Sequence, residues 1–148
     1  DEPLGFFKTI SLDNIEPFTI VLHQPGLLHE LRWDGNDKHE KALDIANNYI
    51  WSSSTLYTDQ VIEYRKNLFD RFIHSADGIT AATVHDFHAS NNGDAENGFV
   101  ISRQTGMKTF SITQAVVQNN AVNFSHADLL QGKRYSETML INHTAIKI

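Results

Sequence analysis

The spacing of apolar residues in the first third of the chain predicts a β-hairpin. Residues 18–22 are β-branched or aromatic in four positions of five, which favours a buried strand. Residues 27–33 place leucine and tryptophan on one face and charged side chains on the other. Pro25 and Gly26 between them form a turn signal, so the two strands are expected to pair antiparallel. The apolar residues within 1–10 have no predicted partner.

The middle of the chain has the period of α-helices. Residues 49–51 predict a short strand that runs into a loop rich in hydroxyl groups, residues 52–55. Thr58 is expected to cap a helix in which apolar residues recur at helical spacing as far as Ile73. We expect Phe69 and Phe72 to be buried on its inner face. A second, shorter helix is predicted from Thr80 to about His88.

The last third alternates strand-like stretches with turns. Strands are predicted at residues 99–103, 108–117, 121–126 and 135–141, after a polar loop at 90–98. The order is therefore strands, two helices and a β-meander, without βαβ alternation. This order predicts an α+β fold with antiparallel sheets. A length of 148 residues predicts one domain over residues 1–148.

Composition limits the classes of function. Hydrophobic residues make up 41% and charged residues 20%, which argues against a disordered chain. The net charge of −6 argues against binding to nucleic acid through phosphates. There is neither a secretory leader nor an apolar run near 18 residues, so we expect no membrane insertion and a cytoplasmic location. The absence of cysteine excludes disulfides, thiolate zinc sites and a cysteine nucleophile within this chain.

Three stretches carry candidate chemistry, and each has a plainer explanation. The hydroxyls of residues 52–55 lie between a predicted strand and a helix, where polar groups often surround a site, although they also suit helix capping. His85 and His88 are neighbours on one helix, but a zinc site needs at least one more ligand. Residues 91–98 contain oxygen ligands without the EF-hand spacing. We therefore expect no metal and no cofactor.

Six stretches are informative in combination: residues 14–22, 31–35, 50–57, 93–97, 99–100 and 108–113. Together they resemble the NRDE family, also named the transport and Golgi organization family, over a range from about Asn14 to Ile141. The resemblance implies a fold similar to half of the αββα sandwich of N-terminal-nucleophile hydrolases. It also implies a cysteine nucleophile at the start of the complete domain, followed by an Asn-Arg-Asp-Glu motif. This chain contains neither, so we expect it to be the C-terminal part of a larger NRDE-like domain.

The resemblance also implies where a site would lie. Residues 52–55 fall where related hydrolases place a loop that binds the oxyanion, so Ser53 or Ser54 would stand in that place, with Thr55 and Asn97 also lining the substrate site. Many relatives carry an arginine near the later strand, where this chain has Glu96 and Asn97. The implied activity is hydrolysis or acyl transfer at amide-type bonds.

Two hypotheses about function follow. In the first, the chain forms the wall of a hydrolase site and needs a missing N-terminal segment or a second chain to supply the nucleophile. In the second, it is a non-enzymatic module that binds a small ligand or a partner chain. An incomplete sheet also leaves open strand edges, which favours a homo-oligomer or another partner.

Overall fold

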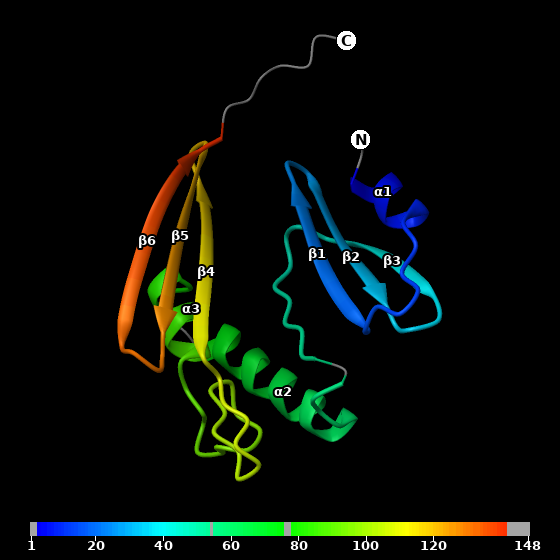
Figure 1. Cartoon of the computed structure of the whole chain (residues 1–148). Helices are drawn as coiled ribbons and strands as arrows, with labels where there is room; N and C mark the ends of the chain where they lie inside the picture. The colour runs from blue at the N-terminus through cyan, green and yellow to red at the C-terminus, as the bar shows by residue number, and fades with distance from the viewer. Residues whose placement is uncertain (1–2, 54, 76–77, 142–148) are drawn as a thin grey trace. The chain divides into compact units, whose positions relative to one another are not determined.

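Two antiparallel sheets organise the computed structural model, which describes residues 3–53, 55–75 and 78–141. In chain order the elements are α1 (Pro3–Thr9), β1 (Phe18–Gln24), β2 (Leu27–Trp33), β3 (Lys38–Leu43), α2 (Asp59–Ser75), α3 (Ala81–His88), β4 (Ser111–Gln118), β5 (Ala121–Asp128) and β6 (Lys133–Leu140). The sheets have the orders β1-β2-β3 and β4-β5-β6 (Figure 1). The fold is α+β as predicted, with one more helix. Two units, Asp1–Phe69 and Asp70–Ile148, each contain one sheet.

The hairpin of β1 and β2 is confirmed. Its strands pair from Phe18 opposite Trp33 to Gln24 opposite Leu27. Gly26 between them has a φ of 75°, a left-handed conformation that suits glycine. The third strand, β3, is not predicted by the sequence because most of its residues are polar or charged. It is fixed instead by the main chain, which pairs with β2 along its whole length.

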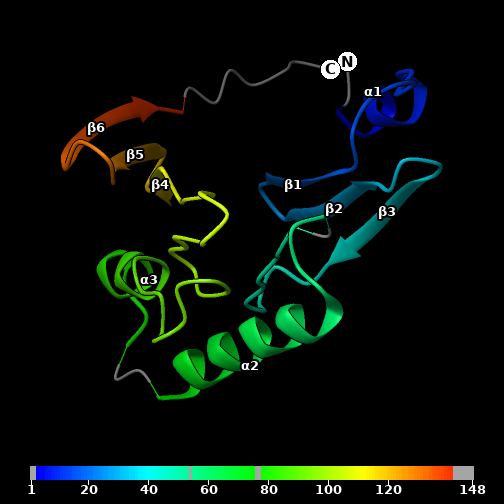
Figure 2. The ribbon, with the colours of Figure 1, turned by 60° about the horizontal axis from the view of Figure 1, so that its bottom comes forward.

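The apolar residues near the start of the chain form α1 and pack on the first sheet. Phe7 and Leu31 are 5% and 3% exposed, and their cluster also contains Leu12, Leu4, Ile10, Phe18, Leu22 and Trp33. Lys38 on β3 donates to the carbonyls of Lys8 and Ile10, at and just beyond the C-terminal end of α1. A cation there suits the negative end of the helix dipole. The helix is thus held against the first sheet (Figure 2).

The strand predicted at residues 49–51 is wrong. These residues are irregular, and side chains rather than main-chain ladders hold them. The indole of Trp51 donates to Glu30 on β2 over 2.8 Å and stacks on Tyr49 with ring centroids 5.7 Å apart. The hydroxyl of Tyr49 in turn donates to the carbonyl of Asp44.

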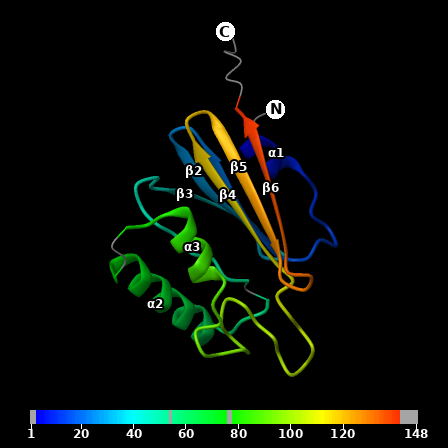
Figure 3. The same ribbon diagram turned by 90° about the vertical axis from the view of Figure 1, so that its left-hand side faces the viewer.

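The second unit contains the predicted meander. Strands β4, β5 and β6 lie side by side in that order, with α3 next to β4 (Figure 3). The predicted short helix is also confirmed, and Thr80 caps it. The side chain of Thr80 accepts from the Thr83 amide, and the Thr83 hydroxyl accepts from the Thr80 amide, which is a capping box.

The strand predicted at residues 99–103 is wrong, because this segment belongs to a hydrogen-bonded loop. Only Ser102 forms a bridge, with Lys108. The Thr109 hydroxyl accepts from the amide of Ile101. Gly98 is required in this loop, since a Cβ built on it would lie 2.1 Å from the carbonyl oxygen of Asn91.

Helix α2 differs from its predicted packing. Phe69 and Phe72 are half-buried, whereas the buried residue of the helix is Arg65, at 8% exposure. Phe72 stacks on Phe87 of α3 at 4.6 Å between ring centroids, and Phe87 lies 4.5 Å from Phe99. Among the described residues, no helix combines the length and the apolar character needed to cross a membrane.

We predict that Phe99→Ala destabilises the second unit by about 3–5 kcal/mol, because it removes a buried ring from the aromatic stack. Phe99 is 8% exposed. Urea unfolding followed by circular dichroism measures the effect. Leu130→Ala is the matched control, because Leu130 is 64% exposed and its loss should change stability by less than about 0.5 kcal/mol. Equal costs for the two variants would contradict this packing.

We predict that acid destabilises the first unit partly through Asp34 in the turn between β2 and β3. Hydrogen bonds from the Asp37 amide, the His39 ring and the Asn36 amide hold the pKa of Asp34 far below its usual range. The folded state therefore favours the carboxylate. Its contribution to stability is complete above the unfolded pKa of about 4 and is lost as pH falls toward the lower folded value.

The thermal midpoint should consequently fall less steeply below about pH 4 in Asp34→Asn than in the unchanged protein. Scanning calorimetry over that range measures the slope. Glu16→Gln removes an exposed carboxylate of the same unit and should follow the unchanged protein. Identical slopes for all three proteins would show that Asp34 has no part in the acid response.

Candidate functional site

A pocket of about 290 Å³ lies in the first unit beside the start of β1. We call it the serine pocket, and its lining residues are Pro17, Phe18, Thr19, Trp51, Ser52 and Ser53. Apolar rings and three hydroxyl groups therefore meet in one concavity. The bond from Trp51 to Glu30 on β2 fixes one side of it. Pockets that combine an apolar wall with a few polar groups are typical of small-molecule sites.

Arg65 of α2 holds the polar side of this pocket. Its Nε donates to the Oγ of Ser52 over 2.9 Å, and its guanidinium carbon lies 4.5 Å from the centre of the Tyr57 ring. The residue is 8% exposed. A buried charge is tolerated in a protein only when it is hydrogen-bonded or paired. Arg65 thus ties the start of residues 52–55 to the helix that follows them.

This bond decides what the hydroxyl of Ser52 can do. Its oxygen accepts from a charged donor, and a hydroxyl in this role can still donate its own proton to another group. Hydrogen bonds in a chain polarise one another, and an acceptor bound to a cation becomes a stronger donor. Ser53 is placed differently. Its Oγ lies 3.1 Å from the Oγ1 of Thr55, and either hydroxyl can be the donor of that bond.

The residues expected from the sequence are distributed over both units. Ser53 lines the serine pocket, and Thr55 contacts Ser53. Ser54 lies outside the described residues. Asn97 belongs to the second unit, where its side chain donates to Asp94 over 3.1 Å. Hydrogen bonds from the side chain and amide of Asn97 hold the pKa of Asp94 below its usual range.

Sequence reasoning missed Arg65 and included Ser52 only as a member of the stretch 52–55. A signal for Arg65 was available. It lies four residues after Val61 and three before Leu68, so a charge interrupts the apolar stripe of the predicted helix. A charged residue in such a stripe needs a partner when the stripe is buried. Ser52 had no signal that distinguished it from its neighbours.

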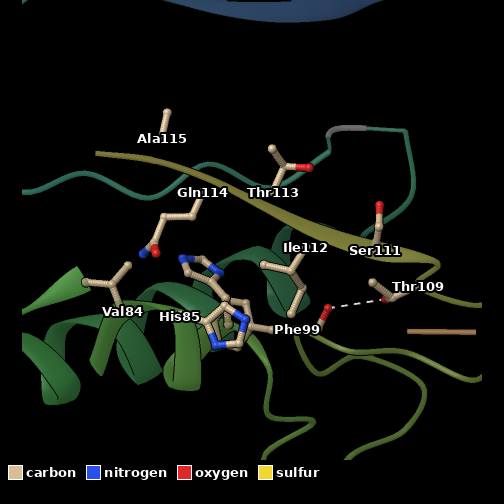
Figure 4. A pocket seen from close by; sticks show the side chains of 10 residues that line it. Val84, His85, Phe99, Thr109, Ser111, Ile112, Thr113, Gln114 and Ala115 are labelled. Atoms are coloured by element: carbon tan, nitrogen blue, oxygen red, sulfur yellow. Dashed lines mark hydrogen bonds between the residues drawn. The ribbon is translucent and has the colours of Figure 1, made fainter. Parts of the chain in front are cut away.

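A second pocket, of about 420 Å³, lies in the second unit between α3 and β4. We call it the histidine pocket, and it is lined by Val84, His85, His88, Phe99, Thr109, Ser111, Ile112, Thr113, Gln114 and Ala115. Figure 4 shows Ile112 and Gln114 pointing toward the helix that carries His85. Gln114 donates through Nε2 to the carbonyl of Ala81. The amide oxygen of Gln114 and the two imidazoles are among the polar groups that line this pocket.

Within the part of the chain that the structure describes, no three residues among histidine, aspartate and glutamate converge in a way that could hold an ion. Among the ion pairs of the described residues, His85 takes part in one, in which its Nδ1 lies 3.3 Å from the carboxylate of Asp86.

Comparisons with models of protein families, with curated proteins and with solved structures find no match for this chain.

Proposed function

We propose that this chain is the C-terminal part of an NRDE-like domain and forms one wall of a site that hydrolyses or transfers amide-type bonds. The serine pocket would be that wall. The nucleophile would be a cysteine of an N-terminal segment or of a second chain. The resemblance in sequence supplies the reaction class, and the hydroxyl groups of the pocket supply the role of this chain.

The observation that carries the proposal is the bond from Arg65 to Ser52 at the edge of a concave pocket. Attack of a thiolate on an amide carbonyl breaks the C–N bond through a tetrahedral intermediate. The carbonyl oxygen becomes negatively charged in that intermediate, and the amine leaves with the proton that the thiol gave up. A preorganised donor about 3 Å from this oxygen lowers the barrier. Ser52 meets the chemical requirement, because its oxygen is already bound to a cation.

Ser53 would have a different part in this reaction. When its hydroxyl donates to Thr55, only its oxygen faces the pocket as an acceptor, and it can hold the amide N–H of a substrate. When Thr55 donates, Ser53 becomes a second donor. The resemblance implies Ser53 or Ser54 as the main donor, whereas we assign this role to Ser52, which has the stronger local support.

We predict that the chain alone is inactive, and that joining it to an upstream cysteine-bearing segment creates amidase activity. In the joined protein, Ser52→Ala should lower kcat by about 10²–10³, the usual cost of an oxyanion donor. Arg65→Met, which keeps much of the packing, should lower kcat in the same direction. Steady-state kinetics on chromogenic amides measure both values.

Ser136→Ala is the matched control for these variants, because Ser136 is an exposed serine in the other unit. It should leave kcat unchanged. A joined protein in which Ser52→Ala and Ser53→Ala both turn over as fast as the unchanged protein would remove the serine pocket from the mechanism.

The second candidate function is a non-enzymatic module that binds a small ligand, and the histidine pocket favours it. The imidazole and phenyl rings that line this pocket would contact the planar ring of a ligand from the side. The amide of Gln114 would orient the polar edge of that ligand. We predict that a fragment set of aromatic carboxylates and heteroaromatic amides contains binders that shift the NMR signals of Gln114 and His85.

Gln114→Leu should then weaken the binders by about tenfold or more, because it removes the orienting amide. His126→Leu is the matched control, since His126 faces the opposite side of the sheet, where it contacts Thr113. Binding that survives Gln114→Leu but not His126→Leu would place the ligand on the other face.

A further inference from the structure

Strand β6 forms one edge of the second sheet in the residues that the structure describes. All eight of its residues, Lys133–Leu140, are exposed. In the described part of the chain it pairs only with β5, in a register that runs without a bulge from Lys133 opposite Asp128 to Leu140 opposite Ala121. The strand contains no proline. Long, regular edges of this kind are ready to pair with another strand.

The charges of β6 are arranged symmetrically about Tyr135. Side chains alternate between the two faces of a strand, so Lys133, Tyr135 and Glu137 share one face. Lys133 precedes the tyrosine by two residues, and Glu137 follows it by two. Arg134 and Ser136 point to the opposite face. The strand therefore carries a cation and an anion at equal distances from an aromatic residue that is 57% exposed.

This symmetry selects one register for pairing between two copies of β6. Directly opposed residues of an antiparallel pair lie on the same face, and a two-fold axis places one residue opposite its own copy. An axis at Tyr135 sets Lys133 opposite Glu137 of the second copy, twice, and sets the two tyrosines together. An axis at Glu137 would oppose two carboxylates. An axis at Ser136 would set Lys133 opposite Met139.

We propose that β6 pairs antiparallel with β6 of a second copy of this chain, about a two-fold axis at Tyr135. Two three-stranded sheets become one continuous sheet, and the pairing closes, because each copy uses its β6 edge. The other edge of the sheet, β4, has no charged residue among its eight, so it offers no charge pattern that selects a register. The occupant of the β6 edge is thus a second copy rather than an unrelated strand.

Charge exchange tests this pairing on the whole chain. Sedimentation velocity from micromolar to millimolar protein should show a monomer–dimer equilibrium that weakens with added salt, because exposed ion pairs are screened. Lys133→Glu alone and Glu137→Lys alone should each weaken the dimer by about tenfold, as two cross-strand attractions become repulsions. The double variant Lys133→Glu with Glu137→Lys should restore the affinity.

Arg134→Glu is the matched control, because it changes the same charge on the same strand but faces Ser136 of the second copy. It should leave the dimer within about threefold of the unchanged protein. A monomer at every concentration overturns the proposal, as does a dimer that the double variant fails to restore. Assembly into species larger than a dimer, unaffected by the charge exchanges, would assign the contact to β4. That result would also overturn the proposal. Circular dichroism confirms that each variant keeps its fold.

Discussion

A three-stranded antiparallel sheet is stable in water only when something packs against it, and this constraint governs both units of the chain. Each sheet meets it with one short helix. In the first unit, Phe7 of α1 packs with Leu31 on β2. In the second, α3 contacts β4, and Ile112 on the inner face and Phe99 line the pocket between them. Lys38 also donates to the carbonyls of Lys8 and Ile10, at and just beyond the C-terminal end of α1. These bonds support the helix, because a helix of seven residues needs contacts outside itself to form.

In the second unit, α3 contacts one face of the sheet. The face of its sheet away from α3, which we call the open face, carries apolar and polar side chains together. The apolar residues are Ala115, Val117, Val122, Phe124, Tyr135 and Met139, and the polar ones are Ser111, Thr113, His126, Asp128, Lys133 and Glu137. Val117, Phe124, Tyr135 and Met139 are each at least 40% exposed. The face toward α3 is more polar at its far end, where Asn123 and Thr138 form a cross-strand hydrogen bond. Exposed apolar side chains that lie together on one face of a sheet are typical of surfaces that bind something else. This supports the proposal that the chain is part of a larger assembly.

Sequence reasoning succeeded where the pattern of apolar residues was strong and failed where the determining contacts are distant. The hairpin of β1 and β2 and the capped α3 were predicted, because alternation, a glycine turn and the Thr80 box are local signals. Strand β3 could not be predicted, since its charged residues are held by pairing with β2. The segment at 49–51 has strand-like residues, but the bond from Trp51 to Glu30 holds its side chains instead. The site was found only in part. Hydroxyl groups at 52–55 were visible, whereas the choice of Ser52 depends on Arg65, thirteen residues later.

Strand edges and sheet faces lack different interactions. Pairing at the β6 edge is therefore compatible with the packing of a further element on the open face. An open edge lacks hydrogen-bond partners for main-chain groups, and any strand of suitable register can supply them. An open face lacks apolar contact, which a layer of side chains from another element supplies. Pairing of β6 with its copy would satisfy the edge and extend the open face without covering it. An element that packs on the open face would supply apolar contact there and would leave the main-chain groups of the β6 edge unpaired. A second copy at the edge therefore does not compete with an element packed on the face.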